Sequence, residues 1–190
     1  MPLFDPTDTL ILVALEDELP HHLLPDWRII YTGVGKVNAA LAAERAIMAF
    51  RPKMMINFGT AGALSPDLHG IVEVSRFYQR DMDVQALGFS LGQTPFEDEG
   101  PIDLGRPGLS CGTGDQFVTA PPALKTDLVD MEAYALAKSA QHHQITFYCL
   151  KYISDQADDA ASTSWKDHVQ KGAKLFVDWL NNINGGDTRT

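Results

Sequence analysis

Two short segments in the last third of the chain place acidic residues where they could do chemistry. The first, 129–133, reads Val-Asp-Met-Glu-Ala and opens an apolar, helix-like run, whereas the second, 151–155, reads Lys-Tyr-Ile-Ser-Asp and closes a strand-like run. Helix starts and strand ends are where α/β folds place ligands. Two carboxyl groups held in one cleft can divide the hydrolysis of a glycosidic bond between them. The first candidates are therefore Asp130, Glu132 and Asp155.

A third acidic segment and two glycine-rich segments lie earlier in the chain. Residues 16–18 read Glu-Asp-Glu after an apolar run, and acids at such a place also suit the N-terminus of a helix. Glycines at 33–36 and 59–62 follow strand-like runs, where they let backbone N–H groups approach a ligand closely. Neither glycine segment matches a dinucleotide fingerprint or a P-loop. Each feature has an ordinary structural explanation, so a functional interpretation depends on all of them occurring together.

The elements that must position these residues alternate along the chain. Strands are expected at 10–15, 27–32, 54–58, 71–77, 109–111 and 145–153, and helices at 37–50, 131–143 and about 165–183. The continuous apolar run 10–15 predicts a strand buried on both faces, and the strand–helix–strand order of 27–58 predicts a largely parallel sheet. Ser164 is the expected N-cap of the last helix, with Asp167 in its first turn. Residues 80–110 are expected to be mostly loop.

Size, composition and charge narrow the class of protein. A chain of 190 residues, of which 45% are hydrophobic, is long enough for one globular domain with a substantial core. We therefore expect a single domain over 1–190, with its core at about 10–183 and a frayed tail at 184–190. The formal net charge of −10 argues against non-specific binding to nucleic acid or to an anionic membrane. No stretch approaches the ~18 apolar residues of a membrane span.

The cysteines and the N-terminus indicate the compartment. Cys111 and Cys149 both lie in apolar runs and no metal-type spacing surrounds them, so we interpret them as buried free thiols. The first residues lack the basic region followed by an apolar stretch that marks a signal peptide. We therefore expect a cytoplasmic protein without a metal site.

Taken in order, these segments resemble the nucleoside phosphorylase/nucleosidase superfamily, and most closely its 5′-methylthioadenosine/S-adenosylhomocysteine nucleosidase branch. The landmarks are ALEDEL at 14–19, TGVGKVNAA at 32–40, NFGTAG at 57–62, DMDVQALGF at 81–89, GDQF at 114–117, VDMEA at 129–133 and ISD at 153–155. Each landmark is weak alone, but the ordered set is specific and spans most of 10–183. The resemblance implies a three-layer α/β sandwich whose central sheet is mixed, largely parallel and twisted, with helices on its faces.

The resemblance also implies a reaction and a role for each acid. The family breaks the N-glycosidic bond between a purine and a ribose or thioribose, through a transition state that resembles a ribosyl oxocarbenium ion. Asp155 would donate a proton or hydrogen bond to N7 of the purine, beside Ser154. Glu18 would orient and deprotonate the attacking water, and Glu132 would accept hydrogen bonds from the ribose hydroxyls while Met131 packs against the sugar.

Further positions would bind the substrate by the same resemblance. Phe117 would stack on the purine and the backbone of Val118 would read its edge, while Thr60 replaces the family's usual serine near the water and the sugar. An apolar 5′ group would meet Leu15, Val34, Val84, Leu87, Phe89 and Pro95. Trp165 matches an aromatic that a partner subunit contributes in the family, which implies a homodimer. Trp165 could equally be an aromatic that packs a helix.

Two departures from the family bear on activity. Lys151 stands where the family usually has an arginine near the water and the acids, so the charge is kept but the planar fork is lost. The segments between 93 and 109 and between 119 and 129 are too short for the helices of longer relatives. A reduced activity or an altered substrate would follow from either departure.

The leading hypothesis is a cofactor-independent hydrolase of 5′-modified adenine nucleosides, whose only expected partners are that small molecule and a second subunit. One alternative is hydrolysis of another purine nucleoside, such as futalosine. A second is a phosphorylase, which would need an arginine cradle for phosphate; Arg76, Arg80 and Arg106 are the loosely placed candidates. A third is a nucleoside-binding member without catalytic activity.

Overall fold

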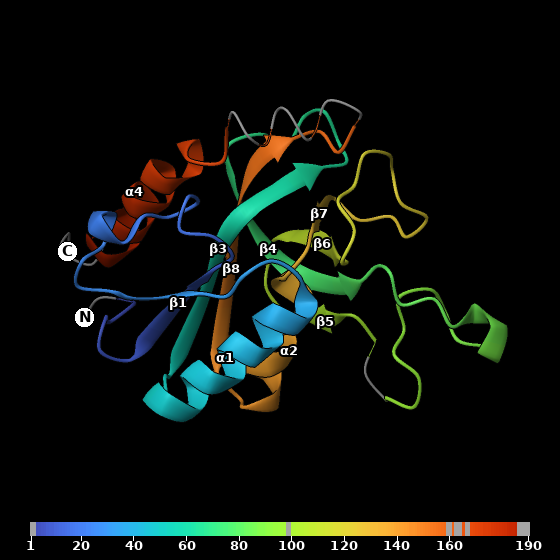
Figure 1. Ribbon diagram of the computed structural model, residues 1–190, viewed down its shortest axis with the longest axis horizontal. Helices are drawn as coiled ribbons and strands as arrows, with labels where there is room; N and C mark the ends of the chain where they lie inside the picture. Colours follow the sequence, from blue (N-terminus) through green and yellow to red (C-terminus); the bar gives the residue numbers. More distant parts are fainter. Residues whose placement is uncertain (1–2, 98–99, 159–160, 162–164, 166–167, 186–190) are drawn as a thin grey trace.

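The computed structural model describes residues 3–97, 100–158, 161, 165 and 168–185 (Figure 1). Its strands are β1 (Thr9–Val13), β2 (Arg28–Tyr31), β3 (Met54–Ala63), β4 (Ile71–Gln79), β5 (Ile102–Asp103), β6 (Leu109–Thr113), β7 (Leu128–Asp130) and β8 (Thr146–Asp155). Its helices are α1 (Lys36–Phe50), α2 (Ala133–His142) and α4 (Lys171–Gly185), with 3-10 turns η1 (His21–Leu23) and η2 (Gln85–Leu87). The expected α/β alternation is confirmed.

The strands form one mixed sheet in the order β2-β1-β3-β7-β6-β4-β5, with β8 paired to both β3 and β4. β1 runs parallel to β2 and β3, and β3 runs parallel to β8. β4 and β6 are parallel, as are β6 and β7, whereas β7 is antiparallel to β3 and β4 to β8. These pairings close on themselves through β3, β8, β4, β6 and β7. The sheet is largely parallel, as expected, and curls around this circuit.

Helices cover both faces of the sheet, so alternate side chains of a central strand enter different cores. Leu10 and Leu12 of β1 belong to the core cluster that includes buried residues of α1 and α2, whereas Ile11 and Val13 belong to the cluster that includes Phe176 of α4. Figure 1 shows α1 and α2 together on one side of β3 and β8, and α4 on the other. The continuous apolar run in the sequence reflects this double burial.

Two boundaries near the candidate acids differ from expectation. β3 was expected to end at Phe58, but it continues through the glycine segment to Ala63, because β8 pairs with it as far as Gly62 and β7 pairs with Gly62 and Ala63. The segment 59–62 is therefore part of a strand and not a strand-to-helix turn. Asp130 was expected at the start of a helix but ends β7, and α2 begins at Ala133.

The C-terminal helix also begins later than expected. α4 starts at Lys171, and a turn at 169–170 separates it from Trp165, where one long helix was expected to begin. The predicted N-cap, Ser164, and the first-turn Asp167 lie outside the described residues. Asn184 was expected in a frayed tail, yet it lies in α4 and its side chain exchanges hydrogen bonds with the backbone of Phe4. Among the described helices, none is long and apolar enough to cross a membrane.

Candidate active site

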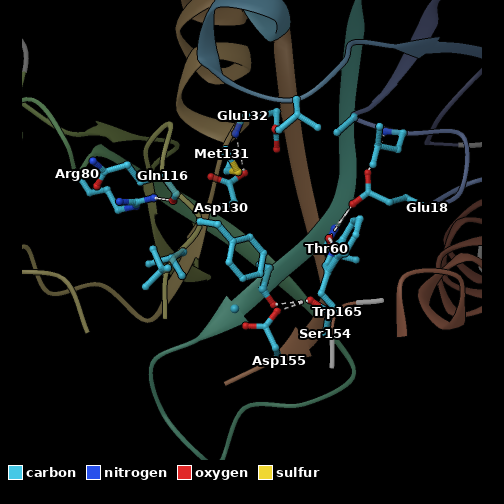
Figure 2. A pocket seen from close by; sticks show the side chains of 18 residues that line it. Glu18, Thr60, Arg80, Gln116, Asp130, Met131, Glu132, Ser154, Asp155 and Trp165 are labelled. Carbon is cyan, nitrogen blue, oxygen red and sulfur yellow. Dashed lines mark hydrogen bonds between the residues drawn. The ribbon is translucent and has the colours of Figure 1, made fainter. Parts of the chain in front are cut away.

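A pocket opens where β1 and β8 end and where β3 passes between them. The residues that line it are Ala14, Leu15, Glu18, Val34, Thr60, Ala61, Gly62, Arg80, Gln116, Phe117, Val118, Val129, Asp130, Met131, Glu132, Ser154, Asp155 and Trp165. Its space of about 560 Å³ includes the open solvent at its mouth. Figure 2 shows Glu132 and Asp155 on opposite sides of it and Glu18 to the side, beside Thr60. The carboxyl ends of parallel strands are the usual ligand site in such sheets.

Glu18 is fixed by three hydrogen bonds from two neighbouring segments. Its Oε1 accepts the backbone N–H and the hydroxyl of Thr60, each at 2.8 Å, and its Oε2 accepts the N–H of Leu15 at 3.1 Å. A Cβ on Gly59 would lie 3.3 Å from Oε1, so the absence of a side chain there leaves room for the carboxylate. Backbone and hydroxyl donors thus hold a buried acid against the floor of the pocket.

Glu132 follows β7, and the loop before α1 holds its carboxylate. The N–H of Gly35 donates to its Oε1 at 2.8 Å, and Gly35 has a φ of 93°, a conformation that glycine adopts without strain. Burial and the negative charge of Asp130 raise the pKa of Glu132 from 4.5 to about 7. This carboxyl therefore changes charge near neutral pH.

Asp155 ends β8 and points into the pocket from the opposite side. Its Oδ2 accepts the hydroxyl of Ser154 at 2.8 Å and its Oδ1 accepts the N–H of Ala157 at 2.9 Å. A Cβ on Gly62 would lie 2.8 Å from Oδ1, which makes the glycine of β3 a condition for this orientation. The neighbouring strand thus leaves space for the acid that the sequence singled out.

A buried ion pair lies beneath the pocket. The ammonium of Lys151 is 2.8 Å from Oδ2 of Asp130, and Lys151 is 1% exposed. Burial alone would lower the pKa of Lys151, but the surrounding acidic groups, Asp130 first among them and then Cys149 and Glu132, together raise it. Burial likewise opposes ionisation of Asp130, yet Lys151 and the hydroxyl of Thr113 keep its pKa low. Lys151, which the resemblance placed near the attacking water and the acids, lies below the lining residues and neutralises Asp130.

Arg80 lines the pocket on the side away from Glu18, where it binds the loop at 114–116. Its Nη2 donates to the carbonyl oxygens of Gly114 and Gln116, the first at 3.1 Å. These contacts hold the loop that carries Phe117 and Val118 against the pocket, and Figure 2 shows Arg80 beside Gln116. Arg80 therefore supports the loop, a role that its position in the sequence did not indicate.

Most of the predicted site residues meet in this pocket: Leu15, Glu18, Val34, Thr60, Phe117, Val118, Met131, Glu132, Ser154, Asp155 and Trp165. Trp165 was expected to come from a partner subunit, but it lines the pocket of its own chain. The expected 5′ positions on the segment after β4 lie outside the pocket: Val84, Leu87, Phe89 and Pro95. This segment carries η2 and projects away from the sheet, which leaves Leu87 69% exposed (Figure 1).

Several lining residues had no role in the leading hypothesis: Ala14, Ala61, Gly62, Arg80, Gln116, Val129 and Asp130. Of these, Asp130 was named only as a candidate acid and Arg80 only as a candidate for binding phosphate. All except Arg80 lie inside the landmark segments, so the signal was their proximity to residues with assigned roles. Arg80 directly precedes such a segment. Within the described part of the chain, no three His, Cys, Asp or Glu side chains gather as a metal ion would need.

Comparison with known proteins places this geometry in a family. A sequence profile for the phosphorylase superfamily matches residues 27–110 and 108–181. The 5′-methylthioadenosine/S-adenosylhomocysteine nucleosidase of Staphylococcus carnosus is 31% identical over an alignment 170 residues long, which covers 75% of this chain and 74% of the relative.

Solved structures share the fold. The 5′-methylthioadenosine/S-adenosyl homocysteine nucleosidase of Helicobacter pylori has a TM-score of 0.83 at 22% identity, covering 96% of this chain and 100% of that one. The futalosine hydrolase of the same species has a TM-score of 0.83 at 22% identity, covering 94% and 97%. The chain therefore belongs to the phosphorylase superfamily, in its branch of 5′-methylthioadenosine/S-adenosylhomocysteine nucleosidases.

Proposed function

We propose that this protein hydrolyses the N-glycosidic bond of a purine nucleoside, with 5′-methylthioadenosine or S-adenosylhomocysteine as substrate and adenine as the released base. One observation carries the proposal: three buried carboxyl groups from distant segments, Glu18, Glu132 and Asp155, line one pocket. Hydrolysis of this bond needs a base for water, a clamp for the sugar and an acid for the leaving group.

Asp155 serves as the acid in this mechanism. The hydroxyl of Ser154 and the N–H of Ala157 fix both of its oxygens, so the carboxyl group has one orientation toward the pocket. As the bond between C1′ and the purine breaks, its electron pair moves to the base, and a proton from Asp155 reaches N7. A neutral base leaves more readily than an anion, and general acid catalysis of this kind contributes about 10²–10⁴-fold in rate.

Glu18 takes a proton from water on the sugar side. Its Oε1 already accepts two hydrogen bonds from Thr60, whereas Oε2 accepts one from the N–H of Leu15. Oε2 therefore has the greater capacity to accept a proton. The water oxygen bonds to C1′, its proton passes to Glu18, and the products are the free base and the free sugar.

Glu132 holds the sugar while positive charge develops on it. In its ionised form the carboxylate accepts hydrogen bonds from two ribose hydroxyls, and its negative charge stabilises the cationic transition state. Because its pKa is about 7, this form gives way to the neutral one as the pH falls through neutrality. Met131 lines the pocket beside it and packs on the sugar face.

Phosphorolysis is disfavoured by the arginines. Arg80 lines the pocket, but its Nη2 is engaged by two backbone carbonyl oxygens. Arg106 pairs with Glu73 at 2.8 Å and lies outside the pocket. A phosphate cradle of arginine forks is therefore not assembled by these two residues. Futalosine remains the second candidate substrate, because a solved futalosine hydrolase shares the fold.

We further propose a homodimer in which the segment 84–96 reaches the pocket of a second copy. α1 presents Val37, Leu41 and Met48 on one exposed face, and the segment presents Leu87 and Phe96, the latter 92% exposed. Several large apolar side chains exposed together are typical of a protein–protein interface. Sedimentation analysis should show a dimer, and Met48→Asp should shift it toward monomer; a wild-type monomer at micromolar concentration would contradict this.

The buried free thiols of Cys111 and Cys149 support a reducing compartment, and we propose that the protein is cytoplasmic.

The activity is tested by incubating the protein with 5′-methylthioadenosine, S-adenosylhomocysteine, adenosine, inosine and futalosine, with and without phosphate. We expect release of free base from the first two without phosphate. A strict phosphate requirement would refute hydrolysis, and thermal stabilisation by a nucleoside without cleavage would indicate a binding protein.

A further inference from the structure

We propose that Trp165 is a positioning residue for the water-activating acid: its indole N–H fixes the hydroxyl of Thr60 as a donor to Oε1 of Glu18. Oε2, which accepts the N–H of Leu15, is then the oxygen left to take the proton of water. The inference rests on the function proposed for Glu18 and concerns how that residue is prepared for it. The proposed role depends on the hydrogen bond from the indole N–H, in addition to any packing of the aromatic ring against the substrate.

The three residues form one hydrogen-bonded chain. Nε1 of Trp165 donates to Oγ1 of Thr60 at 2.9 Å, and that oxygen donates to Oε1 of Glu18 at 2.8 Å. The residues come from segments that are distant in the sequence, and all three line the pocket. Figure 2 shows them side by side along one flank of it.

The chemistry of the three groups fixes the direction of this chain. An indole N–H can only donate, and an ionised carboxylate can only accept. The hydroxyl of Thr60 lies between them and has one proton, so it accepts from Trp165 and donates to Glu18. Without the indole N–H, one constraint on the rotation of this hydroxyl is lost, and its proton can point to other acceptors in the pocket.

The consequence falls on Glu18. With the hydroxyl proton and the backbone N–H of Thr60 both directed at Oε1, the two carboxylate oxygens are unequal. Oε2, which accepts only the N–H of Leu15 among the described donors, is the more basic position. Trp165 thus keeps the carboxylate in one orientation, with its reactive oxygen available to water.

Steady-state kinetics distinguish a positioning role of the indole N–H from simple packing of the ring against the substrate. Trp165→Phe keeps a large aromatic ring and removes the N–H, so we expect KM to change little and kcat to fall about 3–10-fold, the size of one lost hydrogen bond. Thr60→Val, which keeps the shape and removes the hydroxyl, should lower kcat at least as much. Thr60→Ser restores the hydroxyl and should recover most of it. An unchanged kcat in Trp165→Phe, with a raised KM, would overturn the proposal.

Indole signals in nuclear magnetic resonance test the chain without any substrate. The protein has three tryptophans, and Trp165→Phe identifies the signal of that residue. Glu18→Gln should move the Trp165 signal in the presence of Thr60, and should leave it in place when Thr60→Val is combined with it. Trp27 and Trp179 serve as internal controls. A Trp165 signal indifferent to Glu18→Gln overturns the proposal, whether or not any nucleoside is cleaved.

Discussion

Glu132 is proposed to be essential for activity, yet its buried environment means that its ionised form lowers the stability of the folded protein. Glu132 is 8% exposed and its carboxyl group lies near Asp130, and these surroundings raise its pKa from 4.5 to about 7. A pKa raised on folding means that the folded protein prefers the neutral acid. The resulting penalty is absent below the unfolded pKa, grows as the pH rises from 4.5, and is complete above about 7.

The size of the penalty follows from the two pKa values. At about 1.4 kcal/mol per pKa unit, the difference amounts to about 3 kcal/mol at pH 8 and to less than about 1 kcal/mol at pH 5. Glu132→Gln removes the charge and keeps the shape and the oxygen that accepts from Gly35. For a chain of this size, 3 kcal/mol corresponds to an upper bound of about 6–12 °C in melting temperature.

The assay is thermal unfolding of wild type and Glu132→Gln at pH 5 and pH 8, together with turnover of 5′-methylthioadenosine. We expect the variant to melt higher at pH 8, to lose most of this advantage at pH 5, and to turn over far more slowly. Glu16→Gln makes the same chemical change at an exposed site and should alter neither property. A variant equally or less stable at both pH values would refute the reasoning.

Three further predictions concern the residues around Glu132 and opposite it. Asp155→Asn should lower kcat by about 10²–10⁴-fold with little change in KM, and an unchanged kcat would remove this residue from the acid role. Gly62→Ala should lower kcat because its Cβ would crowd the carboxylate of Asp155, whereas Gly100→Ala, with open space around it, should not; equal activities in steady-state assays would contradict this. Lys151→Met should destabilise by about 3–5 kcal/mol in denaturant unfolding, since it leaves Asp130 charged and buried. Adding Asp130→Asn should recover part of that loss, and strict additivity would argue against a coupled pair.

Local patterns were sufficient to predict two of the strands that place the acids, β1 and β8. The apolar run that became β1 and the β-branched and aromatic run that became β8 indicated buried strands, and the acids at or just beyond their ends were expected in one site. Glu18 and Asp155 do line one pocket. The apolar pattern located the ends of these two strands to within about two residues, and a parallel sheet brings such ends together.

What depends on tertiary pairing could not be read from the sequence. The glycine segment 59–62 suggests a turn by composition, and only its partners β7 and β8 make it a strand. Lys151 carries a charge within a strand pattern, and nothing local shows that Asp130 lies against it. Leu87 is apolar like a pocket residue, but the segment that carries it leads away from its own pocket.

The central claim is that water, and not phosphate, attacks the sugar. It is tested most directly by turnover of 5′-methylthioadenosine in ¹⁸O-labelled water that also contains millimolar phosphate, followed by mass spectrometry of the products. We predict adenine and free methylthioribose with ¹⁸O at C1′, at a rate independent of phosphate and strongly reduced in Glu18→Gln. A sugar 1-phosphate without the label would contradict the account.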